Sequence, residues 1–323
     1  MRRREVLLLI GVAGISSLAA RAQQSRLPLI GYLSPGAPSA QNRAALRDGL
    51  AVGGFVEGRD VTIEVRSADG HYDRLPELAA ELIDLKPSAI IVTTPTATLA
   101  AKKATTSIPI VFSMGGDPVA AGLVTSLNHP SGNVTGVTFL SNQLDAKRLQ
   151  MMHRLLPHAN AVAAIANPGN PNTAAEVLAT EDAARSLGLK LFVSRAGTED
   201  EITNALEEVA LRGVTAIHVM ADQFLTSKSE RINALAIGHG IATSFSNVAA
   251  LAGGGLMAYG ADVIETERQA AVYVARILKG EKPGDMPVIQ SSKFAFVLNL
   301  KTAKILGLDL DPNLVRLADQ VIE

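Results

Sequence analysis

Short apolar segments alternate with longer segments of mixed polarity along most of the chain. Residues 28–34, 89–93 and 161–166 are short, almost wholly apolar runs, which are typical of strands buried in a sheet. Residues 41–52 and 72–85 instead repeat apolar positions at the spacing of one helix face. Strands that alternate with helices predict a parallel sheet covered on both faces, so we expect an α/β fold.

The same two patterns predict further elements. Additional strands are expected at 61–65, 108–113, 189–193, 216–220, 241–245 and 255–260. Additional helices are expected at 96–104, 173–187, 201–211, 226–238 and 263–278.

The alternation of strands and helices occurs twice, and the second round begins near residue 142. The first strand of each round leads into a Ser/Asn-Pro-Gly-x-Pro turn, at 34–38 in one round and 167–171 in the other. The third strand of each round ends at polar residues, at 93–96 and 222–223. These parallels favour two similar α/β halves over a chance similarity between turns.

The expected location of a binding site follows from this architecture. In open α/β sheets, ligands bind beyond the carboxyl ends of the strands. If two such sheets face each other, the loops at their strand ends line one shared cleft. Helices that begin in these loops direct unpaired N–H groups into the cleft, and such groups favour an anionic part of a ligand.

The first 22 residues differ from the rest of the chain. Arg2–Arg4 precede an apolar run at 6–20, and Ala20-Arg21-Ala22 offers the small residues that a signal peptidase requires. We interpret 1–22 as an export signal, with a membrane anchor or a buried first helix as the alternatives. Arg3 and Arg4 resemble a twin-arginine signal, although the pattern is imperfect and a general secretory signal is the alternative. We therefore expect a soluble periplasmic protein.

Composition narrows the range of functions. The 323 residues suffice for two domains or lobes, and 47% apolar with 19% charged residues is globular composition. The absence of cysteine excludes disulfides, cysteine-based metal sites and thiol nucleophiles. Removing 1–22 takes four Arg and one Glu from 30 basic and 31 acidic residues, which leaves 26 and 30. This slightly acidic balance argues against nucleic acid as a partner.

Catalytic and metal-binding motifs are missing from the sequence. The six histidines are scattered, and no motif of a metalloprotease, a serine hydrolase or a phosphate-binding loop is present. We expect no metal, no cofactor and no enzymatic activity. The acidic residues Glu207, Glu208, Glu265 and Glu267 are expected on solvent-exposed helix faces.

Several segments together resemble a known family. They are LIGYLS at 29–34, GHYDRLP at 70–76, IPIVF at 108–112, GDP at 116–118, PSGNVTGV at 130–137 and LKGEKP at 278–283. This set is similar to the substrate-binding proteins of ABC transporters related to tryptophan/phenylalanine-type binders. The segment at 130–137 is the most specific of them, and the resemblance covers nearly all of the chain after residue 22.

The resemblance implies a fold and a set of partners. It implies the type I periplasmic-binding fold, in which two Rossmann-like lobes with parallel sheets are joined by a three-crossover hinge. Lobe one is then expected at 28–138 plus about 250–282, and lobe two at 139–249 plus about 283–323. The implied function is capture of a small molecule, often an amino acid, by a monomer that delivers it to a membrane permease with its ATPase.

Candidate ligand contacts in lobe one are short hydroxyl side chains at strand ends. Ser34, Thr94, Thr96 and Ser113, with nearby backbone N–H groups, could hold a carboxylate without a fixed positive charge. The alternative is that Thr96 caps its helix and Ser34 shapes its turn. Asp117, directly before Pro118, contacts the ligand or caps the helix that follows.

Candidate contacts in lobe two include a carboxylate. Asp222 follows an apolar strand and could pair with an ammonium group, or it could cap the next helix. Asn167 and Asn170 could donate their side-chain amides to the ligand. Phe245 and Tyr259 end later strands, where they could enclose the ligand or pack in the core.

Two other functions remain open at this point. A module that senses a ligand for a membrane signalling receptor would need the same binding chemistry, so the sequence does not separate it from a transport protein. An exported α/β enzyme would need a nucleophile, a base or a metal cluster, and no such constellation is visible.

Overall fold

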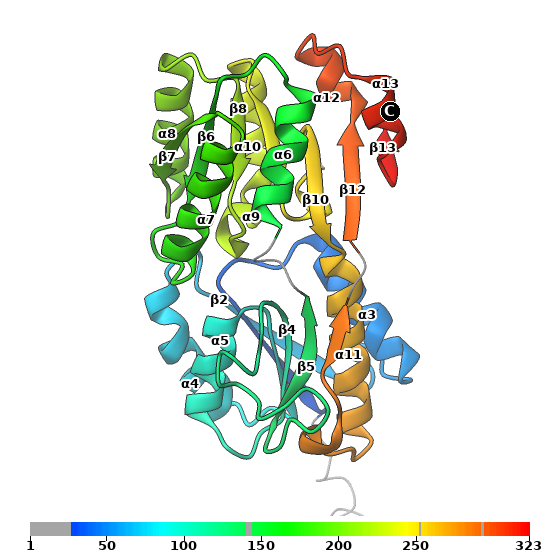
Figure 1. Cartoon of the computed structure of the whole chain (residues 1–323). Coiled ribbons are helices and arrows are strands. Elements are labelled where there is room, and N and C mark those ends of the chain that lie inside the picture. Colours follow the sequence, from blue (N-terminus) through cyan, green and yellow to red (C-terminus); the bar gives the residue numbers. More distant parts are fainter. Residues whose placement is uncertain (1–26, 140–143, 252, 292–293) are drawn as a thin grey trace, which may run out of the picture.

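The computed structural model describes residues 27–139, 144–251, 253–291 and 294–323. The chain forms two lobes, one above the other in Figure 1, and each is built on its own sheet. The proposed export signal at 1–22 lies outside the described residues. Among the residues that are described, no helix is long and apolar enough to cross a membrane.

The first lobe contains a six-stranded parallel sheet with the order β11-β5-β4-β3-β1-β2. Its outer strand β11 comes from much later in the chain than its neighbour β5. The strands are β1 (Leu29–Ser34), β2 (Thr62–Ser67), β3 (Ala89–Val92), β4 (Ile110–Gly115), β5 (Val134–Phe139) and β11 (Ile289–Ser291).

Helices cover both faces of this sheet, which explains why its inner strands β1 and β3 are largely apolar. One face packs against α3 (Ala40–Val52) and α11 (Val263–Leu278), and the other against α4 (Leu75–Asp84) and α5 (Pro95–Ala104). Short 3-10 turns occur at Tyr72–Arg74 and Pro283–Asp285. The α3–α11 contact depends on Gly49, because a Cβ there would lie 2.2 Å from the Arg268 carbonyl oxygen.

The second lobe contains a seven-stranded sheet with the order β13-β12-β10-β9-β8-β6-β7. All its pairings are parallel except that of β10 with β12. The strands are β6 (Ala161–Ala166), β7 (Lys190–Arg195), β8 (Ala216–Val219), β9 (Ala242–Phe245), β10 (Met257–Ala261), β12 (Phe294–Asn299) and β13 (Gln320–Ile322).

The helices of the second lobe also lie on both faces of its sheet. Helices α8 and α10 pack on one face, and α6 and α7 on the other. The helices are α6 (Asp145–Leu155), α7 (Thr173–Ser186), α8 (Glu199–Leu211), α9 (Gln223–Ser227), α10 (Ser229–Gly238), α12 (Leu300–Ile305) and α13 (Pro312–Arg316), with a 3-10 turn at Val248–Leu251.

The chain passes between the lobes three times. The first passage lies between β5 and α6, the second between β10 and α11, and the third between β11 and β12. The second and third therefore fall near 262 and 292, later than the expected 250 and 282. Residues 253–255 stay in lobe two, where Thr302 of α12 donates a hydrogen bond to the Gly254 carbonyl. Residues 289–291 pair with β5 in lobe one.

Most elements expected from the hydrophobic pattern are present, with ends shifted by a few residues. Two expected helices are each divided: 72–85 begins as a 3-10 turn before α4, and 226–238 falls into α9 and α10. Strands β5, β11, β12 and β13 and helices α6, α12 and α13 were not expected.

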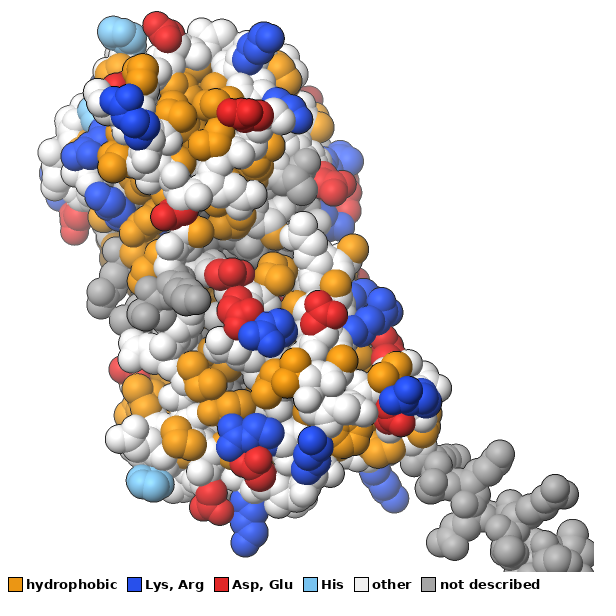
Figure 2. All heavy atoms as spheres, turned by 90° about the vertical axis from the view of Figure 1, so that its right-hand side faces the viewer, with side chains coloured by type: hydrophobic (Ala, Val, Ile, Leu, Met, Phe, Trp, Pro, Cys, Tyr) orange, Lys and Arg blue, Asp and Glu red, His pale blue; other side chains and the backbone are white. Residues whose placement is uncertain are grey.

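Charged side chains are interspersed over the surface of both lobes on the face that Figure 2 shows. Surface ion pairs such as Arg276–Glu281 and Arg185–Asp182 are largely exposed to solvent. Pairs of this kind contribute little to stability, because water screens their charges. The ion pair between Asp145 and Arg148 is the opposite case, since both side chains are buried.

Candidate ligand-binding site

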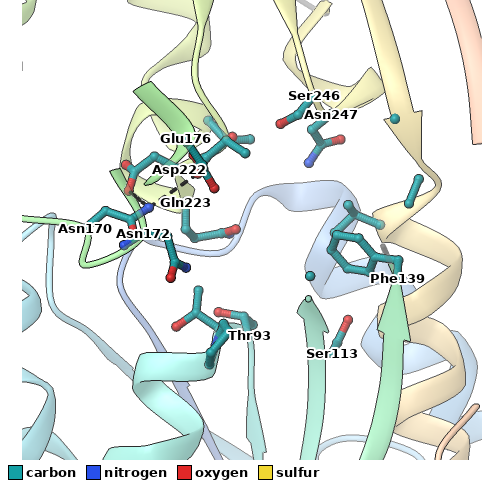
Figure 3. Close-up of a pocket in the computed structure, with 18 of the residues that line it drawn as sticks. Thr93, Ser113, Phe139, Asn170, Asn172, Glu176, Asp222, Gln223, Ser246 and Asn247 are labelled. Carbon is teal, nitrogen blue, oxygen red and sulfur yellow. Dashed lines mark hydrogen bonds between the residues drawn. The ribbon is translucent and has the colours of Figure 1, made fainter. Parts of the chain in front are cut away.

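A cleft lies between the two lobes, at the carboxyl ends of strands from both sheets. It holds about 840 Å³ of space free of protein atoms, including the part open to solvent. Figure 3 shows Thr93 and Ser113 on the side of the first lobe and Asn170, Glu176, Asp222 and Gln223 on the side of the second. The cleft thus lies where α/β folds place their ligands.

The lobes touch at one edge of this cleft. Gly36 lies so close to α9 that a Cβ there would be 2.7 Å from the Gln223 carbonyl oxygen. The hydroxyl of Tyr72, from the first lobe, donates a 2.7 Å hydrogen bond to Asp222 in the second. A ligand in the cleft would therefore contact both lobes at once.

On the first lobe, the cleft is bounded by the N-terminus of α5. Thr94 caps this helix, because its hydroxyl accepts a hydrogen bond from the Ala97 amide at 3.2 Å. Thr96 lines the cleft, and its hydroxyl has no hydrogen-bond partner in the part of the chain that the structure describes. Its position in the first turn also favours an anionic ligand group. The capping role expected for Thr96 therefore belongs to Thr94.

Other hydroxyl groups of the first lobe are already paired within the protein. Thr93 lines the cleft and donates to the Ser34 hydroxyl at 3.0 Å, while Ser34 itself is fully buried behind it. Ser113 lines the cleft and lies 3.1 Å from the Thr266 hydroxyl of α11. Ser34 therefore acts on the cleft only through Thr93.

On the second lobe, Asp222 accepts four hydrogen bonds from the protein. One oxygen accepts from the Leu225 amide at 2.9 Å and from Asn167 at 3.3 Å. The other accepts from Tyr72 at 2.7 Å and from Asn170 at 3.1 Å. Asp222 thus lines the cleft and also caps α9, and its acceptor positions are occupied without a ligand. Burial raises its pKa above the ordinary value, although the hydrogen bonds favour the charged form.

The carboxyl group of Glu176 differs from that of Asp222 in its hydrogen bonding. It lies in the first turn of α7, lines the cleft and is only 7% exposed. Its carboxyl oxygens have no hydrogen-bond or ion-pair partner among the described residues. Burial, together with the negative charges of Asp145 and Asp222, raises the pKa of Glu176 to about 8, while Arg148 acts in the opposite direction.

Arg148 borders the cleft with its charge paired inside the protein, although its buried Nε has no hydrogen-bond partner among the described residues. It is fully buried and pairs with Asp145, and it donates a 3.3 Å hydrogen bond to the Tyr259 carbonyl. His218 lies 3.0 Å from Asp145 on one side and 3.0 Å from the Ser244 hydroxyl on the other. Although burial alone would raise it, His218 and Arg148 hold the pKa of Asp145 below its usual value. The network therefore joins α6 to strands β8, β9 and β10.

Five of the ten residues expected to contact a ligand line the cleft: Thr94, Thr96, Ser113, Asn170 and Asp222. The other five lie elsewhere. Ser34 and Asn167 are buried behind Thr93 and Asp222, and Asp117 is exposed and caps a turn through the Val119 and Ala120 amides. Phe245 packs in the core of the second lobe, and Tyr259 packs near Phe294.

Further residues line the cleft that sequence reasoning did not identify. They include Tyr72, Thr93, Phe139, Arg148, Asn172, Glu176, Gln223, Thr226, Ser246, Asn247 and Glu267. The expectation for Glu267 was wrong, because it is 1% exposed and accepts hydrogen bonds from Tyr32 at 3.1 Å and Asn42 at 2.7 Å. Burial raises its pKa to about 7, against the effect of these two hydrogen bonds. Thr93 and Gln223 belong to the polar strand ends at 93–96 and 222–223, and this position was their sequence signal.

No cluster of three or more metal-binding side chains occurs within 27–139, 144–251, 253–291 and 294–323. The cleft instead combines hydroxyls, amides, two aromatic rings and carboxyl groups. Such a lining suits a small polar molecule that carries both hydrogen-bonding and charged groups.

Comparisons with known proteins agree with this geometry. Residues 36–322 match the family described as ABC transporter substrate binding protein. The chain is 27% identical to a tyrosine-binding protein of Clostridioides difficile, over 79% of this chain and 73% of that protein.

Two solved structures show the same fold. A conserved domain protein from Vibrio cholerae has a TM-score of 0.79 at 24% identity, and covers 92% of this chain and all of its own. An ABC domain from Streptococcus pneumoniae in complex with L-Trp has a TM-score of 0.78 at 23% identity, with the same coverage. The expected two-lobed α/β fold of type I periplasmic-binding proteins is therefore confirmed.

Proposed function

This chain belongs to the ABC transporter substrate-binding protein family, and from that premise we propose that it captures an amino acid between its two lobes. The observation that carries the proposal is the cleft lined from both sheets. Groups for the two charged ends of an amino acid lie on opposite walls of this cleft. A molecule that bridged them would hold the lobes together.

The first lobe offers the groups for the ligand's carboxylate. The Thr96 hydroxyl is unpaired among the described residues and stands in the first turn of α5. A carboxylate there gains from the hydroxyl and from the positive end of the helix dipole. We place the carboxylate at Thr96 rather than at Ser34, because Ser34 is buried behind Thr93.

The side chain of the ligand is proposed to be aromatic. Tyr72 and Phe139 both line the cleft, and rings of this kind pack well against another aromatic ring. One relative is named for tyrosine binding, and a protein of the same fold is in complex with L-Trp. These observations favour tyrosine, tryptophan or phenylalanine.

We also propose where the protein acts. The export pattern at 1–22 supports an extracytoplasmic, periplasmic location, with the twin-arginine pathway as one route. Membership of the family supports delivery of the ligand, by a monomer, to a membrane permease with its ATPase. The family is one of solute-binding proteins, and the chain is proposed to release its ligand unchanged.

Thermal unfolding with a panel of small molecules tests the proposed ligand class. We expect L-Tyr, L-Trp or L-Phe to raise the melting temperature and simple sugars to leave it unchanged, because a ligand that binds the native state alone stabilises it. Thr96→Val should lower the affinity by about tenfold or more, since it removes a hydrogen bond to a charged group.

A matched control is Thr106→Val, the same change at an exposed position outside the cleft. It should bind like the wild type. Stabilisation by a sugar, and by no amino acid, would overturn the proposed ligand class.

A further inference from the structure

Glu176 differs from the other acidic side chains that line the cleft. Asp222 accepts four hydrogen bonds, and Glu267 accepts two. Glu176 is also buried, at 7% exposure, yet its carboxyl group accepts no hydrogen bond from any donor in the described parts of the chain. Figure 3 shows it beside Asp222 on the cleft wall of the second lobe.

The groups packed around Glu176 leave its charge without a counter-ion. Helix α6 contributes Asp145 and Arg148, but these two pair with each other. Asp222 adds a second negative charge from the residue before α9, and Tyr72 adds a neutral hydroxyl from the first lobe. Strand β7 beneath α7 carries Lys190 and Arg195, and within 27–139, 144–251, 253–291 and 294–323 neither forms an ion pair with Glu176.

A buried carboxyl group in such surroundings holds a proton instead of a charge. An unpaired carboxylate is costly to bury, and binding a proton removes that cost. The pKa of Glu176 is raised to about 8, because burial and the charges of Asp145 and Asp222 outweigh the opposite effect of Arg148. In the ligand-free protein near neutral pH, Glu176 is therefore mostly protonated.

We propose that Glu176 receives the ammonium group of the ligand and releases its own proton to the solvent when the ligand binds. This rests on the proposed function, because it requires an amino-acid ligand. The carboxylic acid loses H⁺ to water, and the resulting carboxylate pairs with the ammonium, so charge and protons balance. The sequence alone suggested Asp222 as the partner of the ammonium group, but the Asp222 oxygens already accept four hydrogen bonds. The carboxyl group of Glu176 accepts none from the described residues, so we assign the ammonium group to it.

The proposal predicts that capture depends on pH in a particular direction. Below about pH 8 the free protein must lose a proton in order to bind, so affinity rises with pH, by about tenfold per unit between about pH 6 and 7. The rise levels off near the pKa of about 8. A ligand without an amine, such as indole-3-propionate, leaves Glu176 protonated and shows no such rise.

Isothermal titration of the wild type with L-tyrosine and L-tryptophan, in two buffers of different ionisation enthalpy, counts the protons released. We expect about one proton per ligand near pH 7. Glu176→Gln should release none and bind at least about tenfold more weakly, because the ammonium loses a charged partner. The control Glu181→Gln, an exposed glutamate on the same helix, should behave like the wild type.

The outcomes separate the inference from the proposed function. Binding by the wild type without proton release, and with equal affinity in Glu176→Gln, would overturn the role of Glu176 while the amino-acid receptor stands. No binding of any amino acid would overturn the proposed function and this inference with it. The proton count needs only the wild type, so a variant that fails to fold does not block the test.

Ligand-free unfolding gives a second, independent readout. The folded-state pKa of Glu176 is raised, so its contribution to stability is full below the unfolded value and is lost as pH rises through about 8. Relative to Glu176→Gln, the wild type should therefore lose stability between about pH 5 and 8. A constant difference between the two over this range would contradict the protonated state that the inference requires.

Discussion

Replacing Arg148 with methionine should lower the free energy of unfolding by about 3–5 kcal/mol, which is the usual cost of breaking a buried ion pair. Arg148 is fully buried, and its removal leaves the Asp145 carboxylate buried with His218 as its remaining partner. The Tyr259 carbonyl loses a donor as well. Urea unfolding of the ligand-free protein, followed by circular dichroism, measures the change.

Two variants give this prediction its controls. Arg185→Met removes an ion pair of the same spacing whose partners are 75% and 73% exposed, and it should change stability by less than about 0.5 kcal/mol. Adding Asp145→Leu to Arg148→Met should recover part of the loss, because the Asp145 carboxylate is then no longer left buried without Arg148. If Arg148→Met and Arg185→Met lowered the free energy of unfolding by the same small amount, the prediction would be wrong, because water would then screen the Asp145–Arg148 pair.

Asp222→Ala should destabilise the ligand-free protein by about 2–4 kcal/mol. The change removes the cap of α9, worth about 1 kcal/mol, and leaves buried donors on Tyr72, Asn167 and Asn170 without their acceptor. The Tyr72 bond also joins the two lobes, so its loss should favour a more open cleft. Chemical unfolding measures the stability, and small-angle scattering measures the opening.

Thr198→Ala is the matched control for Asp222→Ala. Thr198 caps α8 with a single hydrogen bond to the Glu201 amide and touches no part of the cleft, so the change should cost only about 1 kcal/mol. An Asp222→Ala variant as stable as the wild type, with greatly weakened amino-acid binding, would instead assign the ammonium to Asp222 and contradict the role given to Glu176.

The strands and helices that the sequence predicts well are those with strong local patterns. The runs 29–34, 89–92 and 161–166 are almost wholly apolar because helices cover both faces of their sheets. The repeated turns at 34–38 and 167–171 do mark equivalent strand ends, and the polar residues at 93–96 and 222–223 do line the cleft. Local periodicity and turn chemistry are enough for this part of the fold.

The features that the sequence does not predict depend on pairing between strands that lie far apart in the chain. Strand β11 has only three residues and is defined by its pairing with β5, more than a hundred residues earlier in the chain. The second and third passages between the lobes depend on such pairings, so they fall later than expected. Local pattern carries no information about which sheet a short strand joins.

The same limit applies to the site residues. Ser34 and Asn167 stand at the expected strand ends, but Thr93 and Asp222 lie between them and the cleft. Glu176 and Glu267 look like ordinary acidic positions on helices, and only the packing of α7 and α11 shows that both are buried. Whether a glutamate faces solvent or a cleft is a property of the neighbouring element, not of its own helix.

The central claim is that the protein binds an amino acid between its two lobes. The most direct test is a crystal structure of the protein in complex with the aromatic amino acid that raises its melting temperature most. We expect density for one molecule in the cleft, with its carboxylate at the Thr96 end of α5, its ammonium within hydrogen-bond distance of Glu176, and its ring beside Tyr72 or Phe139. A ligand bound to the outside of one lobe, or a cleft that holds only water while the protein is saturated, would contradict it.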